Sequence, residues 1–436
     1  MPLPKPRVAF VAGCTGVCGN AIVEFLIRQP KEEWSRIFVS SRTPLKNYWQ
    51  DPRVSFVAMD FLDPVENIIE KLPPSCAEIT HAFFAAYVHA DTLEGLKQAN
   101  IPLFANFLTA IDTVAGESLQ NVCLQTGGKH YGAHLGPVPV PLSEDMGRYE
   151  DNGTNFYYHQ EDTMFRLQAQ RNWSWNVIQP NAVIGFTPGK NGMSEALTMA
   201  LYLLINKELG QTPAFPGNKY FYNSVDDNSF AGGLADLSVW ASTHEHTKNE
   251  SFIHVNGDVF VWRYFFKRLG EYFGLDIPPQ EDWPEEGTKG YHSKHANSIK
   301  MSEWAKDKRP VWEAICEKYG GNKEAFDWGT WAFFDFATGK SWPTISTMTK
   351  ARKFGWLRQD DTYETWADTF RSFENAGILP SQHLLLADRK PIDQQGSNGH
   401  VSNGHASNGH ASNGHASNGH ASNGHASNGH ASNGHV

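Results

Sequence analysis

The chain has 436 residues, 40% of them hydrophobic and 13% aromatic, enough to bury a large core in one or two α/β domains. A formal net charge of −10, with no dense run of Lys and Arg, argues against a nucleic-acid partner. The N-terminal residues MPLPKPR lack the apolar core of a signal peptide, and no stretch approaches the roughly 18 apolar residues that span a membrane. We therefore expect a soluble, cytoplasmic enzyme without membrane partners, as a monomer or homodimer.

The first predicted strand, residues 8–12, is a short unbroken apolar run, typical of a parallel strand covered on both faces. A glycine-rich turn follows, and then a helical pattern with apolar residues on one side. Glycines at such a turn let a dinucleotide pyrophosphate approach the N–H groups at the helix N-terminus. An ordinary tight turn is the alternative, but the order of strand, turn and helix favours a cofactor site. Its predicted residues are Gly13, Thr15, Gly16, Val17 and Gly19.

Further strand signals alternate with helical patterns along the first half of the chain. They lie at residues 37–41, 54–59, 81–86, 122–125 and 175–179. This alternation predicts an α/β fold with a Rossmann-type, doubly wound parallel sheet. Ligands of such sheets bind beyond the carboxyl ends of the strands, so the residues directly after each strand are the candidates for the site.

The end of the second strand bears on the choice of cofactor. An NAD site usually has an acidic residue here for the ribose 2′-hydroxyl, but this chain has Ser40, Ser41 and Arg42. Hydroxyl groups and a guanidinium suit the 2′-phosphate of NADPH, whereas the alternative is a solvated surface arginine. The missing acid favours NADPH. Asp60, after the third strand, is placed to accept from the adenine amino group or to cap a helix near Pro64.

Two motifs follow the fifth strand, Leu-Gln-Thr-Gly-Gly-Lys-His-Tyr at 124–131 and Asn-Phe-Tyr-Tyr-His-Gln-Glu-Asp at 155–162. The Tyr-x-x-x-Lys pair of typical short-chain dehydrogenases is absent here, because acidic residues stand four positions after Tyr157 and after Tyr158. A match at 319–323 comes too late in the chain to reach a nicotinamide. The usual catalytic pair is therefore not expected.

Together with the glycine turn at 13–19, these motifs resemble the progesterone 5β-reductase/iridoid synthase-like (PRISE) group of atypical short-chain dehydrogenase/reductases. The similarity covers about residues 7–379. The resemblance implies NADPH as cofactor and reduction of the carbon–carbon double bond of an activated enone. It also implies catalytic roles for Lys129 and Tyr157.

The chemistry of enone reduction is consistent with these two residues. Hydride added to the β-carbon pushes negative charge onto the carbonyl oxygen, so the site needs hydrogen-bond donors aimed at a developing enolate. We assign Tyr157 as the donor and Lys129 as its electrostatic partner, which is expected to lower the tyrosine pKa from its usual value near ~10. The alternatives are an aromatic residue that only packs and a lysine on the surface.

The resemblance implies further residues of the site. Those expected near the nicotinamide are Thr126, Gly127, Pro180, Asn181 and Val183. Tyr87 stands where the plant members have tryptophan beside the substrate, and His134 lies in a stretch that carries a bulky aromatic residue in those members. We therefore expect a reshaped pocket, to which the steroid and monoterpene substrates of the plant members are not transferred.

The rest of the chain divides into two parts. Residues 191–385 are expected to form a mostly helical substrate-binding region, interleaved with an NADPH-binding core at 1–190 and including an apolar helix at 197–205. Repeated Ser-Asn-Gly-His units at 386–436 predict a disordered tail. The His-Glu-His run at 244–246 lies in a charged loop without further ligands, and we expect no metal site.

The sequence thus predicts an NADPH-dependent reductase of an activated carbon–carbon double bond in a small apolar substrate, in specialised metabolism. A carbonyl reductase that uses the same tyrosine to protonate an alkoxide is one alternative. A non-redox cyclase or cofactor-binding scaffold on the same fold is another. The presence of Lys129, Tyr157 and the glycine turn argues against the second alternative.

Overall fold

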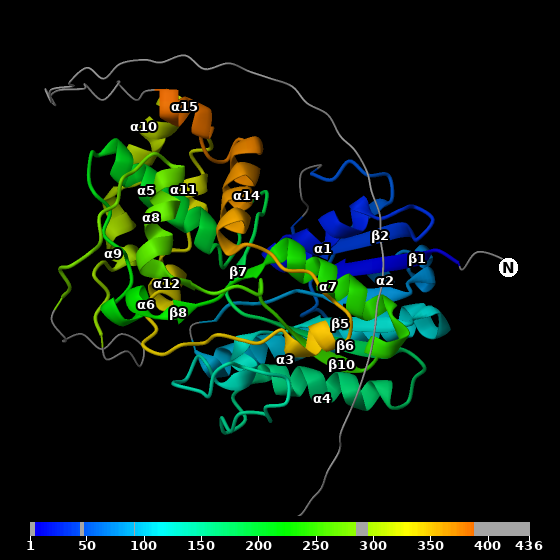
Figure 1. The fold of residues 1–436 in the computed structure, drawn as a ribbon. Helices are drawn as coiled ribbons and strands as arrows, with labels where there is room; N and C mark the ends of the chain where they lie inside the picture. Colours follow the sequence, from blue (N-terminus) through cyan, green and yellow to red (C-terminus); the bar gives the residue numbers. More distant parts are fainter. Residues whose placement is uncertain (1–4, 44–47, 91, 285–294, 388–436) are drawn as a thin grey trace, which may run out of the picture. The chain divides into compact units, whose positions relative to one another are not determined.

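A computed structural model describes residues 5–43, 48–90, 92–284 and 295–387 (Figure 1). Seven parallel strands form one sheet in the order β10-β6-β5-β4-β1-β2-β3. The strands are β1 (Arg7–Ala12), β2 (Trp34–Ser41), β3 (Val54–Ala58), β4 (His81–Phe84), β5 (Asn121–Gln125), β6 (Ser174–Pro180) and β10 (Glu250–His254). The doubly wound parallel sheet predicted from the sequence is confirmed.

The order of the strands reverses between β1 and β4, which are neighbours in the sheet but are separated in sequence by β2 and β3. In doubly wound sheets such a switch point opens a crevice at the carboxyl ends of the two strands. The glycine turn follows β1, and Ala85 follows β4, so both lie at this crevice. The topology therefore positions the glycine turn where ligands of this fold bind.

Helices cover both faces of the sheet. On one face lie α1 (Val17–Arg28) and α7 (Ala231–Thr243), and on the other lie α2 (Val65–Lys71), α3 (Leu93–Ala115) and α4 (Phe156–Gln168) (Figure 1). Alternate residues of β1 point into the two cores, because side chains along a strand alternate between its faces. Phe10 packs on the side of α3, and Val11 packs on the side of α1.

A second, helical core belongs to the C-terminal half. Its centre is α5 (Glu195–Glu208), which is buried on almost all sides and contains the apolar helix predicted at 197–205. The larger helices around it are α8 (Trp262–Tyr272), α10 (Arg309–Tyr319) and α14 (Thr362–Asn375). The shorter helices are α6 (Lys219–Asn223), α9 (Met301–Trp304), α11 (Ala325–Trp328), α12 (Trp331–Ala337) and α15 (Gln382–Ala387). The short helix α13 (Thr349–Lys353) instead packs against β10, in the core on the α1 side of the sheet.

Short elements connect these parts. Two small pairs of strands are β7 (Val183–Ile184) with β9 (Ser229–Phe230) and β8 (Val225–Asp226) with β11 (Phe260–Val261). The 3-10 helices are η1 (Pro74–Glu78), η2 (Gly116–Ser118), η3 (Gly128–Tyr131), η4 (Glu245–Thr247) and η5 (Ala305–Asp307). Of these, η3 and β7 follow β5 and β6 directly and carry residues of the predicted site.

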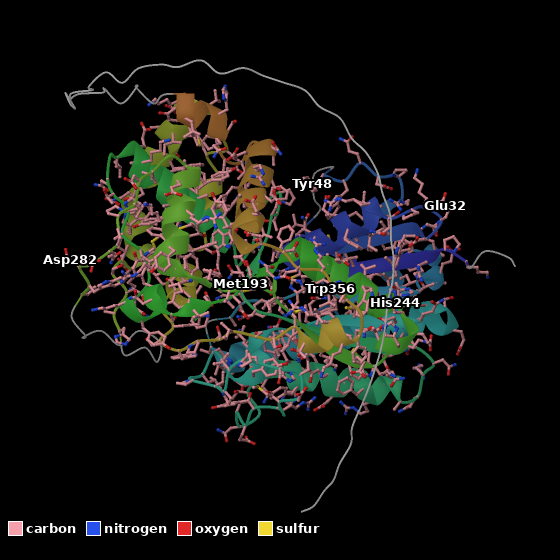
Figure 2. The ribbon with its side chains drawn as sticks, viewed as in Figure 1. Glu32, Tyr48, Met193, His244, Asp282 and Trp356 are labelled. Carbon is pink, nitrogen blue, oxygen red and sulfur yellow. The ribbon has the colours of Figure 1, made fainter. Side chains whose placement is uncertain are left out.

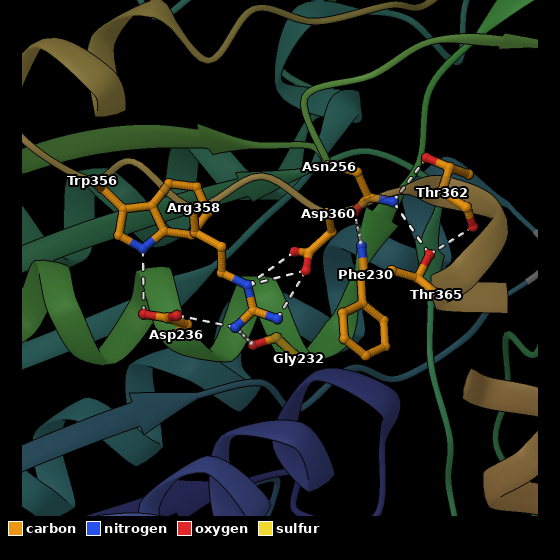
Figure 3. Close-up of polar contacts among 9 residues, drawn as sticks. All are labelled: Phe230, Gly232, Asp236, Asn256, Trp356, Arg358, Asp360, Thr362 and Thr365. Carbon is orange, nitrogen blue, oxygen red and sulfur yellow. Dashed lines mark hydrogen bonds and ion pairs between the residues drawn. The ribbon is translucent and has the colours of Figure 1, made fainter. Parts of the chain in front are cut away.

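The C-terminal segment after α13 is tied to α7 by polar contacts (Figure 3). The Trp356 indole donates to Asp236 at 3.3 Å, and the Arg358 guanidinium contacts Asp236 and Asp360, each at 3.0 Å. The Asn256 amide, just beyond β10, donates to Thr362 at 3.0 Å. These contacts connect the last part of the described chain to the sheet and its covering helix.

The predicted division of the chain can be compared with the structure only in part. The boundary at residue 190 stays a prediction, and β10, from the second segment, pairs with β6 from the first. The first two residues of the predicted tail, 386 and 387, belong to the helix α15, and the rest of it, 388–436, lies outside the described residues. Within the described part of the chain, no helix is both long and apolar enough to cross a membrane.

Candidate active site

Two cavities lie at the carboxyl ends of the strands. The first has a volume of about 560 Å³ and is lined by the turn after β1 and the end of β2; we call it the glycine-turn cavity. The second has a volume of about 250 Å³ and is lined by Lys129 and Tyr157; we call it the tyrosine cavity. Val17, Cys18 and Met193 line both, and Figure 2 labels Met193 between the sheet and the C-terminal helices. The two cavities are therefore adjacent compartments.

The glycines after β1 are required by close packing within the protein. A Cβ on Gly13, whose φ is +78°, would lie 2.6 Å from the Ala85 backbone. A Cβ on Gly19 would lie 2.2 Å from the Gly13 carbonyl oxygen. Gly13 and Gly16 line the cavity together with the predicted Thr15 and Val17, whereas Gly19 lies behind them and holds α1 against the turn.

The N-terminus of α1 and the end of β2 give the glycine-turn cavity its polar groups. No side chain caps the helix at Gly16, so its first N–H groups face the cavity without a side-chain partner. Ser41 and Arg42 line the cavity as predicted, and so does Ser40, whose buried hydroxyl has no hydrogen-bond partner in the described chain. Lys190 adds a second cation. This set of donors and cations fits a phosphorylated nucleotide.

Asp60 is placed differently from the other predicted cofactor residues. Its neighbours Met59 and Phe61 line the glycine-turn cavity, but Asp60 is not among the lining residues. Its carboxylate accepts a hydrogen bond from the Leu62 N–H at 3.0 Å. The carboxylate therefore stabilises the turn before α2, but it does not cap that helix, whose N-cap is Pro64 and has no side-chain hydrogen bond.

Asn155 connects the two segments that carry the predicted catalytic residues. It is the N-cap of α4, where its Oδ1 accepts from the Tyr157 N–H at 3.1 Å. Its Nδ2 donates to the Lys129 carbonyl at 2.7 Å. One amide side chain thus holds η3 and the start of α4 together, and both Lys129 and Tyr157 line the tyrosine cavity.

The contact of Lys129 and the pKa of Tyr157 both differ from the expectation. The Lys129 ammonium donates to the Tyr87 hydroxyl at 3.2 Å, and burial lowers the pKa of Lys129 to about 8. The prediction that this lysine lowers the pKa of Tyr157 is wrong, because burial, with smaller effects of Tyr87 and Cys18, raises that pKa. Tyr157 is therefore a protonated phenol, a hydrogen-bond donor and not a base.

The two predicted pocket residues lie in different compartments. Tyr87 lines the glycine-turn cavity, where its hydroxyl receives the Lys129 hydrogen bond. His134 lines the tyrosine cavity, and burial, together with the nearby charge of Lys129, lowers its pKa to about 4. His134 is therefore neutral near pH 7, and its role stays a prediction.

Most residues predicted near the nicotinamide gather at the tyrosine cavity. They are Thr126, Pro180, Asn181 and Val183. Gly127 is not a lining residue, and a Cβ there would lie 3.2 Å from the Pro180 carbonyl oxygen. The Asn181 side-chain amide donates hydrogen bonds to the Asp227 carboxylate at 2.7 Å and to the Thr344 carbonyl at 3.0 Å. The structure groups these residues, and their contacts with a cofactor stay predictions.

Sequence reasoning missed polar residues that the C-terminal half brings to the cavities. Lys190 lines the glycine-turn cavity, and Glu195, Asp226 and Lys340 line the tyrosine cavity. A signal was available only for Glu195, which stands directly before the apolar run at 197–205. The others belong to segments far apart in sequence, and no local pattern connects them.

Comparison with known proteins identifies relatives over most of the chain. The pattern of the PRISE-like Rossmann-fold domain matches residues 9–380. The short chain dehydrogenase gsfE of Penicillium aethiopicum is 40% identical over 378 residues, covering 86% of this chain and 100% of that protein. The (S)-8-oxocitronellyl enol synthase ISY1 of Nepeta racemosa is 31% identical over 386 residues, covering 86% of this chain and 94% of the relative.

A solved structure agrees with the fold. UDP-glucose 4-epimerase of Thermotoga maritima superposes with a TM-score of 0.58 at 16% identity, covering 85% of this chain and 99% of the epimerase. At this identity the likeness concerns the fold alone. The domain match and the sequence relatives show that the chain belongs to the PRISE-like Rossmann-fold family of short-chain dehydrogenase/reductases, a group of oxidoreductases.

Proposed function

We propose that the protein is an NADPH-dependent reductase that adds hydride to the β-carbon of an enone. The observation that carries the proposal is the protonated, buried phenol of Tyr157 in the tyrosine cavity, next to the segment of Lys129. Reduction of an enone needs a donor to the carbonyl oxygen, where negative charge develops, and it needs no base. A phenol is protonated at neutral pH, and Tyr157 lines the cavity with that group, so it can be this donor.

NADPH is the proposed cofactor, and it would supply the hydride when bound. The uncapped first turn of α1 would hold its pyrophosphate. Arg42 and Ser41, at the end of β2, would bind the 2′-phosphate, and Lys190 would add positive charge to the same cavity. The absence of an acidic residue at the end of β2 supports NADPH over NADH.

The residues of the tyrosine cavity would act on the substrate. Tyr157 donates a hydrogen bond to the carbonyl oxygen, and the hydrogen bond strengthens as the oxygen gains charge. The Lys129 ammonium, bound to the Tyr87 hydroxyl, contributes positive charge near this oxygen. Phe221, Phe333 and other apolar side chains line the same cavity and would pack against the apolar part of the substrate. The enolate product then takes a proton from solvent.

A relative supports this choice of reaction. The 3-oxo-Delta(4,5)-steroid 5-beta-reductase of Arabidopsis thaliana is 29% identical over 382 residues, covering 84% of this chain and 92% of that protein. Its name describes reduction of a conjugated ring ketone at the carbon–carbon double bond. The name belongs to that protein, and the proposal for this chain depends on Tyr157 and Lys129.

The test is oxidation of NADPH by the purified full chain with benzylideneacetone and cyclohexenone, with each product identified by mass spectrometry and NMR. The saturated ketone is the expected product, and Tyr157→Phe is expected to abolish most of its formation. An allylic alcohol would instead establish carbonyl reduction. Binding of NADPH without turnover of either compound would overturn the proposal in favour of a non-redox function.

A further inference from the structure

One wall of the tyrosine cavity carries charged side chains that the proposed reduction does not use. Glu195, Asp226 and Lys340 line it, beside the aromatic side chains of Phe221 and Phe333. The three polar residues come from the start of α5, from β8 and from the segment after α12. None of them is needed to hold the carbonyl oxygen or the cofactor, so this wall calls for its own explanation.

Two of the three polar groups have partners within the protein. The Lys340 ammonium lies 3.9 Å from an Asp226 carboxylate oxygen and donates to the Thr344 hydroxyl at 2.8 Å. The other Asp226 oxygen accepts from the Trp262 indole at 3.0 Å. Asp226 and Lys340 therefore form a fixed, largely desolvated ion pair at the wall of the cavity.

Glu195 is different. Its residue is only 8% exposed, and its carboxyl accepts no hydrogen bond from any residue in the described chain. Burial raises its pKa to about 7, while Lys340 lowers and Asp226 raises that pKa, so both groups act on the Glu195 carboxyl. The carboxyl oxygens of Glu195 are not among the fully enclosed polar atoms without a partner, so they face the cavity. A ligand hydroxyl in the cavity can therefore donate to this carboxyl in place of water.

The charges around Glu195 restrict the chemistry of that ligand. Asp226 and Lys340 pair with each other, and Glu195, whose pKa is raised to about 7 by burial, is only partly ionised near neutral pH, so the wall has little net charge to select an ionic ligand. A neutral hydroxyl satisfies both sides, because it donates to a carboxyl oxygen and accepts from an ammonium. The neighbouring phenylalanine rings favour an aromatic or other flat apolar body for the rest of the ligand.

From this arrangement we infer that Glu195 and Lys340 bind a hydroxyl group of the substrate, away from the carbonyl that Tyr157 holds. The substrate class is then a hydroxylated, aromatic enone. This inference rests on the proposed function, since it concerns the substrate of the same cavity. It adds a specificity determinant that lies in the C-terminal half of the chain.

The first experiment compares three substrates in the full chain: benzylideneacetone, its para-hydroxy analogue and its para-methoxy analogue. The para-hydroxy compound is expected to have a kcat/KM about tenfold above that of the methoxy compound, as for a hydrogen bond to a charged group. In Glu195→Met this preference is expected to disappear. Glu208→Met, at the other end of α5 and outside the cavity, is the matched control.

A second measurement does not depend on turnover. Isothermal titration of the NADP⁺-saturated protein compares the Kd of benzylacetone with that of its para-hydroxy analogue, in the wild type and in Glu195→Met and Lys340→Met. The hydroxylated ketone is expected to bind about tenfold more tightly, and only in the wild type. Thermal unfolding of each variant shows whether it is folded, and Glu195→Gln serves if Glu195→Met is not.

The outcomes separate the two proposals. Reduction of all three enones at similar kcat/KM, with equal Kd values for the two ketones, would overturn the hydroxyl subsite and leave the reductase proposal standing. Selective binding of the hydroxylated ketone without reduction of any enone would keep the subsite and overturn the reductase proposal. Equal losses for every substrate in Glu195→Met would assign Glu195 a purely structural role and overturn the subsite.

Discussion

The Lys129 ammonium donates to the Tyr87 hydroxyl at 3.2 Å and lies 5.5 Å from the centroid of its ring. Tyr87 lines the glycine-turn cavity and Lys129 lines the tyrosine cavity, so this contact joins the two compartments. The contact stabilises the charged form of a lysine whose pKa is lowered by burial. The charge of Lys129 near neutral pH therefore depends on a residue in the adjacent compartment.

The first prediction concerns the dependence of activity on pH. Lys129 is charged below its pKa of about 8 and neutral above it, so kcat/KM for an enone should fall as the pH rises through that value. Tyr87→Phe removes the acceptor of the ammonium and should move this fall to lower pH by roughly 0.5–1 pH unit. Lys129→Arg, which stays charged, should lack it. Identical pH profiles in the wild type and Tyr87→Phe would show that the hydrogen bond has no catalytic effect.

The second prediction concerns the phenol of Tyr157. Tyr157→Phe keeps the buried ring and removes only the donor, so kcat should fall by about 10²- to 10³-fold while the Kd of NADPH stays the same. Tyr149→Phe is the control, since Tyr149 is 40% exposed and does not line the tyrosine cavity. Steady-state kinetics and a fluorescence titration of NADPH provide the two readouts. An unchanged kcat in Tyr157→Phe would remove Tyr157 from the reaction.

The third prediction concerns the preference for NADPH. Arg42→Ala should raise the KM for NADPH by about 10- to 100-fold, as expected for the loss of a charge-assisted hydrogen bond, and should leave the KM for NADH unchanged. Arg36→Ala is the matched control, because Arg36 lies in β2, the strand that Arg42 follows, but pairs with Glu78. Equal effects of Arg42→Ala on both cofactors would argue against recognition of the 2′-phosphate.

The fourth prediction concerns stability. Gly19→Ala places a Cβ 2.2 Å from the Gly13 carbonyl oxygen, so α1 has to move away from the turn. The expected loss in the free energy of unfolding is about 1–3 kcal/mol, measured as a lower Tm and a lower urea midpoint. Gly147→Ala is the control, because a Cβ at that position has nothing within 4 Å. Similar stabilities of the two variants would mean that the turn adapts without strain.

The sheet was predictable because its signals are local. The segments at 8–12 and 122–125 are short apolar runs bounded by turn residues, and each became a central strand with one added residue at its start. The pairing of β10 with β6 was not predictable in the same way. Phe252 and Ile178 are neighbours in the sheet, but several helices and loops separate them in the sequence. Such pairing depends on the whole fold.

The sequence predicted which residues belong to the candidate site better than it predicted the contacts between them. Motifs indicated Lys129 and Tyr157, but the raised pKa of Tyr157 follows from its burial, which no motif states. The partner of Lys129 is Tyr87, from another strand end. Glu195 and Lys340 meet at one cavity although many helices separate them in sequence. Local pattern therefore identified reactive groups and missed the environment that sets their protonation.

The position of β10 at the edge of the sheet has a consequence for synthesis of the protein. While a nascent chain extends from residue 180 to residue 254, β6 has no neighbour on its outer side, and this lasts roughly 4–15 s at typical rates of translation. An unpaired strand edge invites pairing with other chains. The parallel sheet is therefore completed only by residues that are synthesised after its other strands, and a fragment ending at residue 190 would keep that edge open.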